Sequence, residues 1–367
     1  MAIRRSDEIT TKGGLRAALW ISRAVAAVVL VAALVWVWRL TRGGGAIDFY
    51  QYYAHAQIAG RQYPPDLYDP MAQRELGEEL YGRAADSGSL VHLGDATLRR
   101  GLDSTATPLL YTVFGWLPRD YELGLSLFRI LLILAFAAGT LLLARTARME
   151  WTLALLVTAA LLRWCRPFHD DVWVGNVGGF QLLGLALFLA LSERFPATAA
   201  AILTLVIGFK PNIVPIVILL VVLRVVSRDF ARLRREALAG AAAATAGFLA
   251  SALFYRSWDV WLDWLGAARD FYTRLPGREW NNVAPALPFY QRYGTDASSF
   301  LTLPLLLLAA GILLWKRHDG LAVALGITVY LLSAPTVWGQ YLVLLVPAAF
   351  GVVMTIAARR PLTPVKT

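Results

Sequence analysis

The chain of 367 residues has little charge and almost no cysteine. Only 16% of its residues are charged, 57% are hydrophobic, and the mean hydropathy is +0.54. This composition excludes an ordinary soluble domain and indicates a polytopic membrane protein. The single cysteine, Cys165, cannot form an internal disulfide. We therefore expect the outer loops to be held by packing and Cys165 to be a small core residue.

Nucleotide-binding motifs are also missing. The sequence has no Walker loop and no Rossmann fingerprint, and its glycine run at 43–45 is typical of a hinge. The formal net charge of +10 does not indicate nucleic acid, because Lys and Arg gather in short clusters between apolar runs. Such clusters are typical of cytoplasmic loops that contact anionic lipid. We expect membrane lipids as partners, no nucleic acid and no cofactor.

Apolar runs of about 20 residues, the length needed to cross a bilayer, recur along the chain. Short basic turns alternate with longer aromatic loops, and the positive-inside rule places the basic turns and both termini in the cytoplasm. The segment 108–118 is too short to span and is expected to be a re-entrant or interfacial helix on the outer side. The predicted spans are 17–40, 121–144, 150–166, 177–192, 197–210, 212–227, 236–256, 300–315, 320–334 and 340–358.

The pattern predicts an all-α polytopic membrane protein with about 10–12 transmembrane helices in a single domain, 1–367. Its extracytoplasmic loops include 41–120 and the aromatic 257–299. A short helix is expected over 48–59, and Asp69-Pro70 marks the start of a second, amphipathic helix on the membrane surface. The apolar stripe of that second helix is Ala72, Leu76 and Leu80.

Asp48 directly follows the first span and opens an aromatic stretch. A helix N-terminus favours an ionised carboxylate, and an ionised carboxylate just outside a bilayer suits a general base for a lipid-borne substrate. The alternative is a structural role as the helix N-cap. The adjacent rings, including Tyr52 and Tyr53, are either interfacial belt residues or a wall for a sugar ring.

Cations on the predicted outer side are candidates for phosphate contact. Arg163 and Arg166 have the fork geometry for bidentate phosphate binding, or they belong to an ordinary solvated turn. Lys210 lies between two apolar runs and either snorkels to headgroups or holds a lipid phosphate. The run His-Asp-Asp at 169–171 is a weak metal pattern, because neighbouring positions rarely converge on one ion. We therefore expect no metal site.

Aromatic and amide side chains in the outer loops are the remaining candidates. Trp258, Trp261 and Trp264 share one helical face, which either anchors the loop at the interface or stacks on a sugar. The substrate-binding candidates are Tyr52, Tyr53, His169, Asn176, Asn281, Asn282, Trp338 and Gln340.

One base combined with several cations suits a sugar donor that is activated by phosphate. Glycosidases need two carboxylates because an alkoxide leaving group must be protonated, whereas phosphate leaves as a stable anion. A single carboxylate can then deprotonate the acceptor hydroxyl while Lys and Arg stabilise the growing phosphate charge. Nucleotide sugars are cytoplasmic, so an outward-facing site indicates a lipid-phosphate sugar.

The stretch 48–53, with 59–60 and 67–70 downstream, resembles the first outer loop of glycosyltransferase family 87. These enzymes are polyprenyl-phosphate-mannose-dependent mannosyltransferases of the GT-C class. Similar segments follow in the family's order, so the resemblance runs from about residue 46 to 347; these segments are 175–177, 210–211 and 333–338. The resemblance implies a GT-C-like bundle, with Asp48 as the catalytic base and Lys210 near the donor phosphate.

The sequence departs from the family pattern at three places. Residues 175–178 are Gly-Asn-Val-Gly where the family usually has Gly-Gln-Val-Asn. Residues 338–340 are Trp-Gly-Gln in place of Trp-Asp-His, and 106–108 are Ala-Thr-Pro in place of Tyr-Pro-Pro. The missing acid and histidine leave the acceptor, the sugar and the retention of catalysis open.

Together these features predict an inverting glycosyltransferase in the cell membrane with an extracytoplasmic active site. It would move a sugar, with mannose favoured, from a polyprenyl-phosphate donor to a lipid-anchored or glycan acceptor. Two alternatives stay open. A transporter or flippase of lipid-linked sugars would need paired charges in mid-span and repeated halves. A catalytically inactive family member would bind lipid-linked glycan without transferring the sugar.

Overall fold

The structure is a computed structural model, and it describes residues 3–58, 68–102, 104–273 and 282–358. These residues form helices and turns only, apart from one bridge between Asn282 and Trp338. The predicted all-α fold is therefore confirmed.

Ten apolar helices make up the bundle within the described residues, and each corresponds to one predicted span. Five segments are long and apolar enough to cross a membrane: Ala17–Thr41 of α1, α6, α12, α15 and Gly339–Ala357. The others are shorter apolar helices. The bundle helices are α1 (Ile3–Thr41), α6 (Tyr121–Thr146), α7 (Trp151–Trp164), α9 (Gly178–Leu191), α10 (Pro196–Phe209), α11 (Val214–Val226), α12 (Phe230–Tyr255), α15 (Ser298–Trp315), α16 (Asp319–Ser333) and α17 (Leu345–Ala357).

Short elements complete several of these helices at one end. A helix of 14 residues is about 21 Å long, which is less than the roughly 30 Å of a hydrocarbon core. α8 lies just before α9, η1 follows α10, and η3 precedes α17; α8 also packs against η3. The short elements are α2 (Ile47–Ile58), α3 (Pro70–Asp86), α4 (Leu90–Leu98), α5 (Pro108–Val113), α8 (Arg166–Val174), η1 (Pro211–Ile213), α13 (Val260–Thr273), α14 (Leu287–Tyr293), η2 (Thr295–Ala297) and η3 (Gly339–Leu344).

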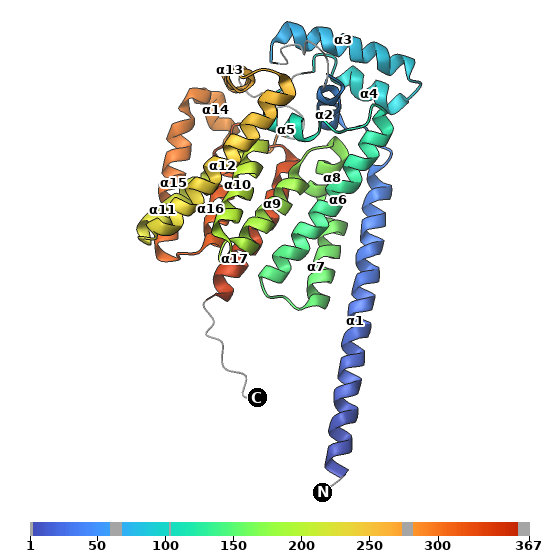
Figure 1. The fold of residues 1–367 in the computed structure, drawn as a ribbon, viewed down its shortest axis with the longest axis vertical. Coiled ribbons are helices and arrows are strands. Elements are labelled where there is room, and N and C mark those ends of the chain that lie inside the picture. The colour runs from blue at the N-terminus through green and yellow to red at the C-terminus, as the bar shows by residue number, and fades with distance from the viewer. Residues whose placement is uncertain (1–2, 59–67, 103, 274–281, 359–367) are drawn as a thin grey trace.

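The two ends of the bundle differ in character. α2, α3, α4, α5 and α13 gather at the upper end in Figure 1. The start of α1, the end of α17 and the turn between α6 and α7 lie at the lower end. The basic turns thus share one end with the described termini, as the alternation of loops predicts. That this end faces the cytoplasm stays a prediction.

Two helices of the first long loop pack their apolar side chains against the protein. Asp69 caps α3 as predicted, accepting a hydrogen bond from Ala72 N at 2.8 Å. The apolar stripe of α3, however, is buried against the protein, because Leu76 and Leu80 are only 3% and 2% exposed. The segment 108–118 contributes only the six-residue α5, whose Leu110 is fully buried. This segment does not cross the bundle as a span, and α5 packs against α2.

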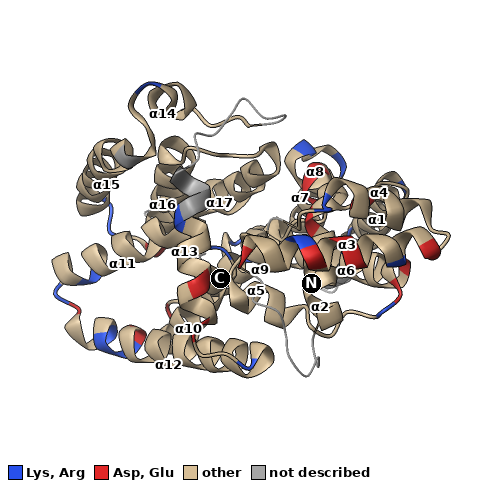
Figure 2. Cartoon of the chain, turned by 90° about the horizontal axis from the view of Figure 1, so that it is seen from above, with Lys and Arg blue, Asp and Glu red and all other residues tan. Residues whose placement is uncertain are grey.

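Four charged side chains join helix ends at the basic end of the bundle. Arg224 of α11 is bonded to Glu236 of α12 at 3.0 Å and to Asp319 of α16 at 2.6 Å. Arg232 bonds the same two carboxylates at 2.7 and 2.6 Å. Figure 2 shows coloured residues near the turn between α11 and α12, while most of the ribbon is uncharged. Each charge is compensated, which is the condition for burying it.

Replacing Arg224 by Met should destabilise the protein by about 3 kcal/mol, because two buried carboxylates then share one arginine. The matched control is Arg235→Met, at an exposed position on α12, which should change stability by less than about 0.5 kcal/mol. Thermal unfolding of both variants in the same detergent measures the difference. Equal unfolding temperatures would show that the network does not hold the helices together.

Candidate active site

Asp48 lies in the first turn of α2, and its side chain is 22% exposed. Arg99, which follows α4, donates from Nη2 to Asp48 Oδ1 at 2.9 Å and from Nε to Ile47 O at 3.1 Å. The N-cap alternative for Asp48 is wrong, because α2 already begins at Ile47 and Asp48 lies inside its first turn. The backbone N–H just before α2 is instead bonded by Asp95 of α4. Its two carboxylate oxygens accept from Ala46 N at 2.9 and 2.8 Å. Asp48 is therefore free of a capping duty and is oriented by an arginine.

Lys210 lies in the break between α10 and η1, on the same upper end. Its ammonium donates to Asn176 Oδ1 at 2.5 Å and to Tyr341 OH at 3.4 Å, and it lies 4.4 Å from the Tyr341 ring centroid. Burial lowers the pKa of Lys210, while the carboxylates of Asp48 and Asp171 raise it. Lys210 and Tyr341, which are 131 residues apart in sequence, are thus in contact. The structure brings Asp48, Lys210 and Asn176 into one electrostatic cluster.

Asp171 of α8 is fully buried beside this cluster. Its carboxylate accepts from Gly178 N at 3.1 Å and Gly179 N at 3.0 Å, at the start of α9. Burial raises the pKa of the Asp171 carboxyl to about 7, although Lys210 and the two N–H groups lower it. Asp171 thus ties α8 to α9 and places a second acidic group near Lys210.

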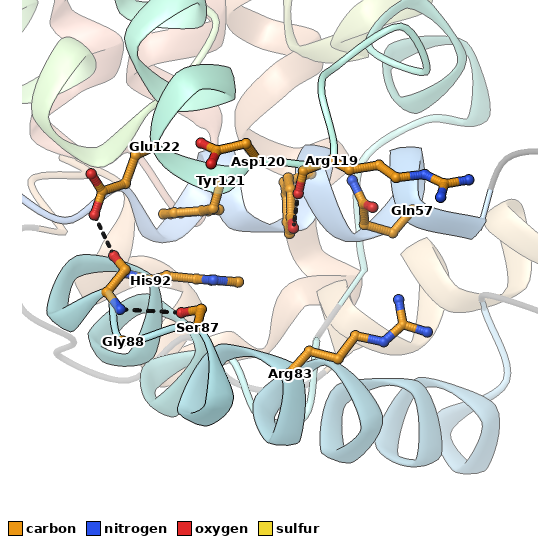
Figure 3. A pocket seen from close by; sticks show the side chains of 11 residues that line it. Gln57, Arg83, Ser87, Gly88, His92, Arg119, Asp120, Tyr121 and Glu122 are labelled. Atoms are coloured by element: carbon orange, nitrogen blue, oxygen red, sulfur yellow. Dashed lines mark hydrogen bonds between the residues drawn. The ribbon is translucent and has the colours of Figure 1, made fainter.

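The aromatic side chains of α2 lie on two different sides of the helix. Tyr52 is buried and stacks on Phe114 at 5.2 Å. Burial raises the pKa of its hydroxyl, and Asp48, Tyr341 and Asp171 add to the rise, so Tyr52 faces the cluster. Tyr53 instead donates to Arg119 O at 2.7 Å and lines a cavity of about 560 Å³ on another side of α2 (Figure 3).

Gly175 allows α2 and α8 to approach closely. It ends α8 in the left-handed region, at φ +74°. A Cβ at this position would lie 2.5 Å from Phe49 Cβ and 3.0 Å from Ala46 Cβ. Only glycine satisfies both the dihedral angle and this contact. The local sequence therefore positions Asn176 against the turn that carries Asp48.

The cations predicted around residue 165 do not join Lys210 in the structure. Arg163 is exposed, with its guanidinium 4.0 Å from the Trp36 ring centroid. The Arg166 side chain is 75% exposed and pairs with Asp170 at 3.0 Å. His169 is buried, with Nε2 2.7 Å from Leu162 O. The His169 contact joins α8 to α7, the Arg163 contact joins α7 to α1, and the Arg166 pair lies within α8. A role for the three residues in substrate binding stays a prediction.

The candidates in the later loops surround η3. Asn282 Oδ1 accepts from Val337 N at 3.1 Å, and Val283 N donates to Val337 O at 2.8 Å, so this loop is tied to the segment before η3. Trp338 is half-buried, and Gln340 is buried next to Tyr341. Asn281 lies outside the described residues.

Sequence reasoning missed several members of the cluster. Asp171 and Tyr341 stand next to residues that it selected, but their side chains meet Lys210 only through the fold. Arg99 gave no signal, since a single arginine in a long polar loop has no characteristic spacing. Among the described residues, no group of three or more His, Cys, Asp or Glu side chains could hold a metal ion.

The fold and the site define a multi-pass membrane protein with a charged cluster at one end of a helical bundle. The family model for glycosyltransferase family 87 matches residues 106–365, more than half of the chain, so the chain belongs to this family and is a membrane glycosyltransferase. The match includes Asn176, Lys210 and Trp338 and begins after Asp48. No curated protein and no solved structure matches the chain.

Gly175→Ala should destabilise the protein and abolish transfer, because the new methyl group displaces the start of α2. Gly294→Ala is the control, since Gly294 has a similar φ of +78° and nothing within 4 Å of an added Cβ. Backbone strain costs about 1–2 kcal/mol at Gly175, which is left-handed, and more at Gly294, whose ψ of 167° lies in a region essentially restricted to glycine. Only Gly175→Ala adds a clash. Unfolding temperature and transferase activity are measured together. Equal losses in the two variants would contradict a close contact between α2 and α8.

Proposed function

We propose that this glycosyltransferase moves a sugar, with mannose favoured, from a polyprenyl-phosphate donor to a lipid-anchored or glycan acceptor on the extracytoplasmic face. Asp48 is the general base, and the anomeric configuration inverts. The observation that carries the proposal is a pair of half-buried opposite charges, each held in place at the end of the bundle away from the basic turns: the Asp48 carboxylate by Arg99 and the Lys210 ammonium by Asn176.

The reaction is a single displacement. Asp48 accepts the proton of an acceptor hydroxyl, whose oxygen forms a bond to the anomeric carbon while the bond from that carbon to the phosphate oxygen breaks. Attack opposite the leaving group inverts the carbon, and the products are the glycoside and polyprenyl phosphate. Lys210 stabilises the negative charge that grows on the leaving phosphate. Its bond to Asn176 keeps the ammonium in place while donor is absent.

Arg99 assists as a positioning residue. Its guanidinium bonds both the Asp48 carboxylate and the Ile47 carbonyl, so the orientation of the base is linked to the backbone that carries it. A general base must present its oxygen to the acceptor hydroxyl, and this pairing fixes the direction of the carboxylate. Membrane embedding of the bundle suits a lipid-linked donor, since the tail of such a donor can lie between apolar helices.

Asp48→Asn should abolish transfer, because the amide cannot accept the acceptor proton; removal of a general base costs about 10²–10⁴-fold in rate. Purified protein is incubated with radiolabelled polyprenyl-phosphate mannose and a membrane lipid extract, and labelled product is counted. Asp86→Asn, an exposed aspartate at the end of α3, is the matched control and should keep full activity.

The same assay separates the alternatives. Lipid movement without product would indicate a flippase, and binding without product in the unaltered protein would indicate an inactive family member. Retained transfer by Asp48→Asn, with the wild-type unfolding temperature, would remove Asp48 as the base.

Lys210→Ala should weaken use of the donor by about 10–100-fold, because a charge-assisted contact to phosphate is lost. The readout is the donor concentration at half-maximal rate, with acceptor held constant. Lys316→Ala, a lysine in a basic turn at the other end of the bundle, is the control. If Lys210→Ala changes only the acceptor dependence, Lys210 does not contact the donor phosphate.

A further inference from the structure

A cavity of about 560 Å³ lies beside α2 and takes no part in the cluster around Lys210. Its walls come from α2, the end of α3, the start of α4 and the turn before α6 (Figure 3). This volume is within the range of small-molecule sites. Asp48 and Lys210 do not line the cavity.

One wall of the cavity is aromatic. The rings of His92 and Tyr121 are stacked with centroids 4.4 Å apart and planes at 9°, and Tyr53 meets both edge-on at 5.4 and 5.0 Å. His92 is only 6% exposed, and its Nε2 has no hydrogen-bond partner among the described residues. Aromatic faces beside polar groups suit a ligand with both C–H and O–H surfaces.

The polar wall carries both signs of charge. Arg83 and Arg119 reach towards Gln57 from opposite sides of the cavity (Figure 3). Arg119 is exposed, and its guanidinium has no side-chain partner in the described part of the chain. The carboxylates of Asp120 and Glu122 line the same cavity.

The presence of both arginines and carboxylates distinguishes between two ligand classes, an anion and a neutral sugar. A phosphate or other anion would be opposed by the two carboxylates, whereas a sugar hydroxyl both donates and accepts. Arg83 already pairs with Glu79, and Glu122 and Asp120 already accept from Ser89 Oγ at 2.6 Å and Leu123 N at 2.8 Å. The lining therefore offers donors on Arg119 and acceptors on the second oxygen of each carboxylate and on the Gln57 amide oxygen. The cavity therefore favours a neutral polyol over an anion.

α2 connects this cavity to the proposed base. Asp48 and Tyr53 are five positions apart, a rise of about 7.5 Å along a helix. Along α4, His92 lines the cavity, Asp95 bonds the N–H just before α2, and Arg99 bonds Asp48. The same helix pair thus carries the cavity and Asp48, which lie on different sides of α2 because five positions also turn a helix by about 140°.

We infer that this cavity is a subsite for a neutral glycan, holding acceptor sugars remote from the hydroxyl that reacts. The inference rests on the proposed function for its place in the reaction, and on the cavity alone for glycan binding. It names the acceptor class as an oligosaccharide or a glycolipid with more than one sugar.

Binding of mannotriose and of cellotriose to the full-length protein is measured by saturation-transfer NMR, with inorganic phosphate as competitor. The cavity variants are Arg83→Gln/Arg119→Gln and Gln57→Ala. Arg74→Gln, at an exposed arginine on α3 outside the cavity, is the matched control. At least one trisaccharide should bind, with about tenfold or greater weakening in both cavity variants and none in Arg74→Gln.

Three results would overturn the inference: no trisaccharide binding by the unaltered protein, binding that both cavity variants retain, or displacement of the trisaccharide by phosphate. Unfolding temperatures confirm that the variants are folded. The proposed function fails separately, if Asp48→Asn still transfers sugar. If the cavity variants then still show the expected weakening of trisaccharide binding, the glycan site is supported even though Asp48 is not the base.

Discussion

The whole arrangement depends on how the turn between α1 and α2 is held between two opposite charges. Arg129, buried in α6, donates from Nη2 to Gly44 O at 2.8 Å and Gly45 O at 3.0 Å. Asp95 accepts from Ala46 N and from Tyr121 OH. The carbonyls of Gly44 and Gly45, which follow α1, thus meet a cation, and the N–H of Ala46, which precedes α2, meets an anion. Both charges have the sign that the dipole of the adjacent helix end favours.

This double contact explains why an arginine stands inside an apolar helix. A buried guanidinium is costly unless its donors are satisfied. Here backbone carbonyls accept from Nη1 and Nη2, while Nε has no hydrogen-bond partner among the described residues. Because Arg129 and Asp95 hold the turn from both sides, the direction in which α2 leaves the bundle is fixed. The direction of α2 determines which of its side chains face Lys210 and which face the cavity, and both the proposed base and the proposed glycan subsite depend on it.

Broken helices supply the other half of the site. Lys210 and Asn176 stand where apolar helices stop short, and Tyr341 lies in the 3-10 turn η3. Backbone that leaves a helix inside a membrane protein is tolerated where protein buries it or where it lines a cavity. The ammonium of Lys210 links these breaks, because it contacts both Asn176 and Tyr341. A mixed polar cluster can therefore exist at the end of an otherwise apolar bundle.

The amino-acid sequence by itself determined the membrane class, the ten apolar helices and the start of α3 at Asp69. These are local properties, set by hydropathy, charge alternation and capping chemistry. It also singled out Asp48, Lys210 and Asn176 as polar residues at helix ends. Only the tertiary structure decided that Arg99 holds Asp48, that Asp95 bonds the N–H just before α2, and that Arg163 and Arg166 lie apart from Lys210. Contacts between distant segments follow from how helices pack in three dimensions, and no spacing along the chain encodes that packing.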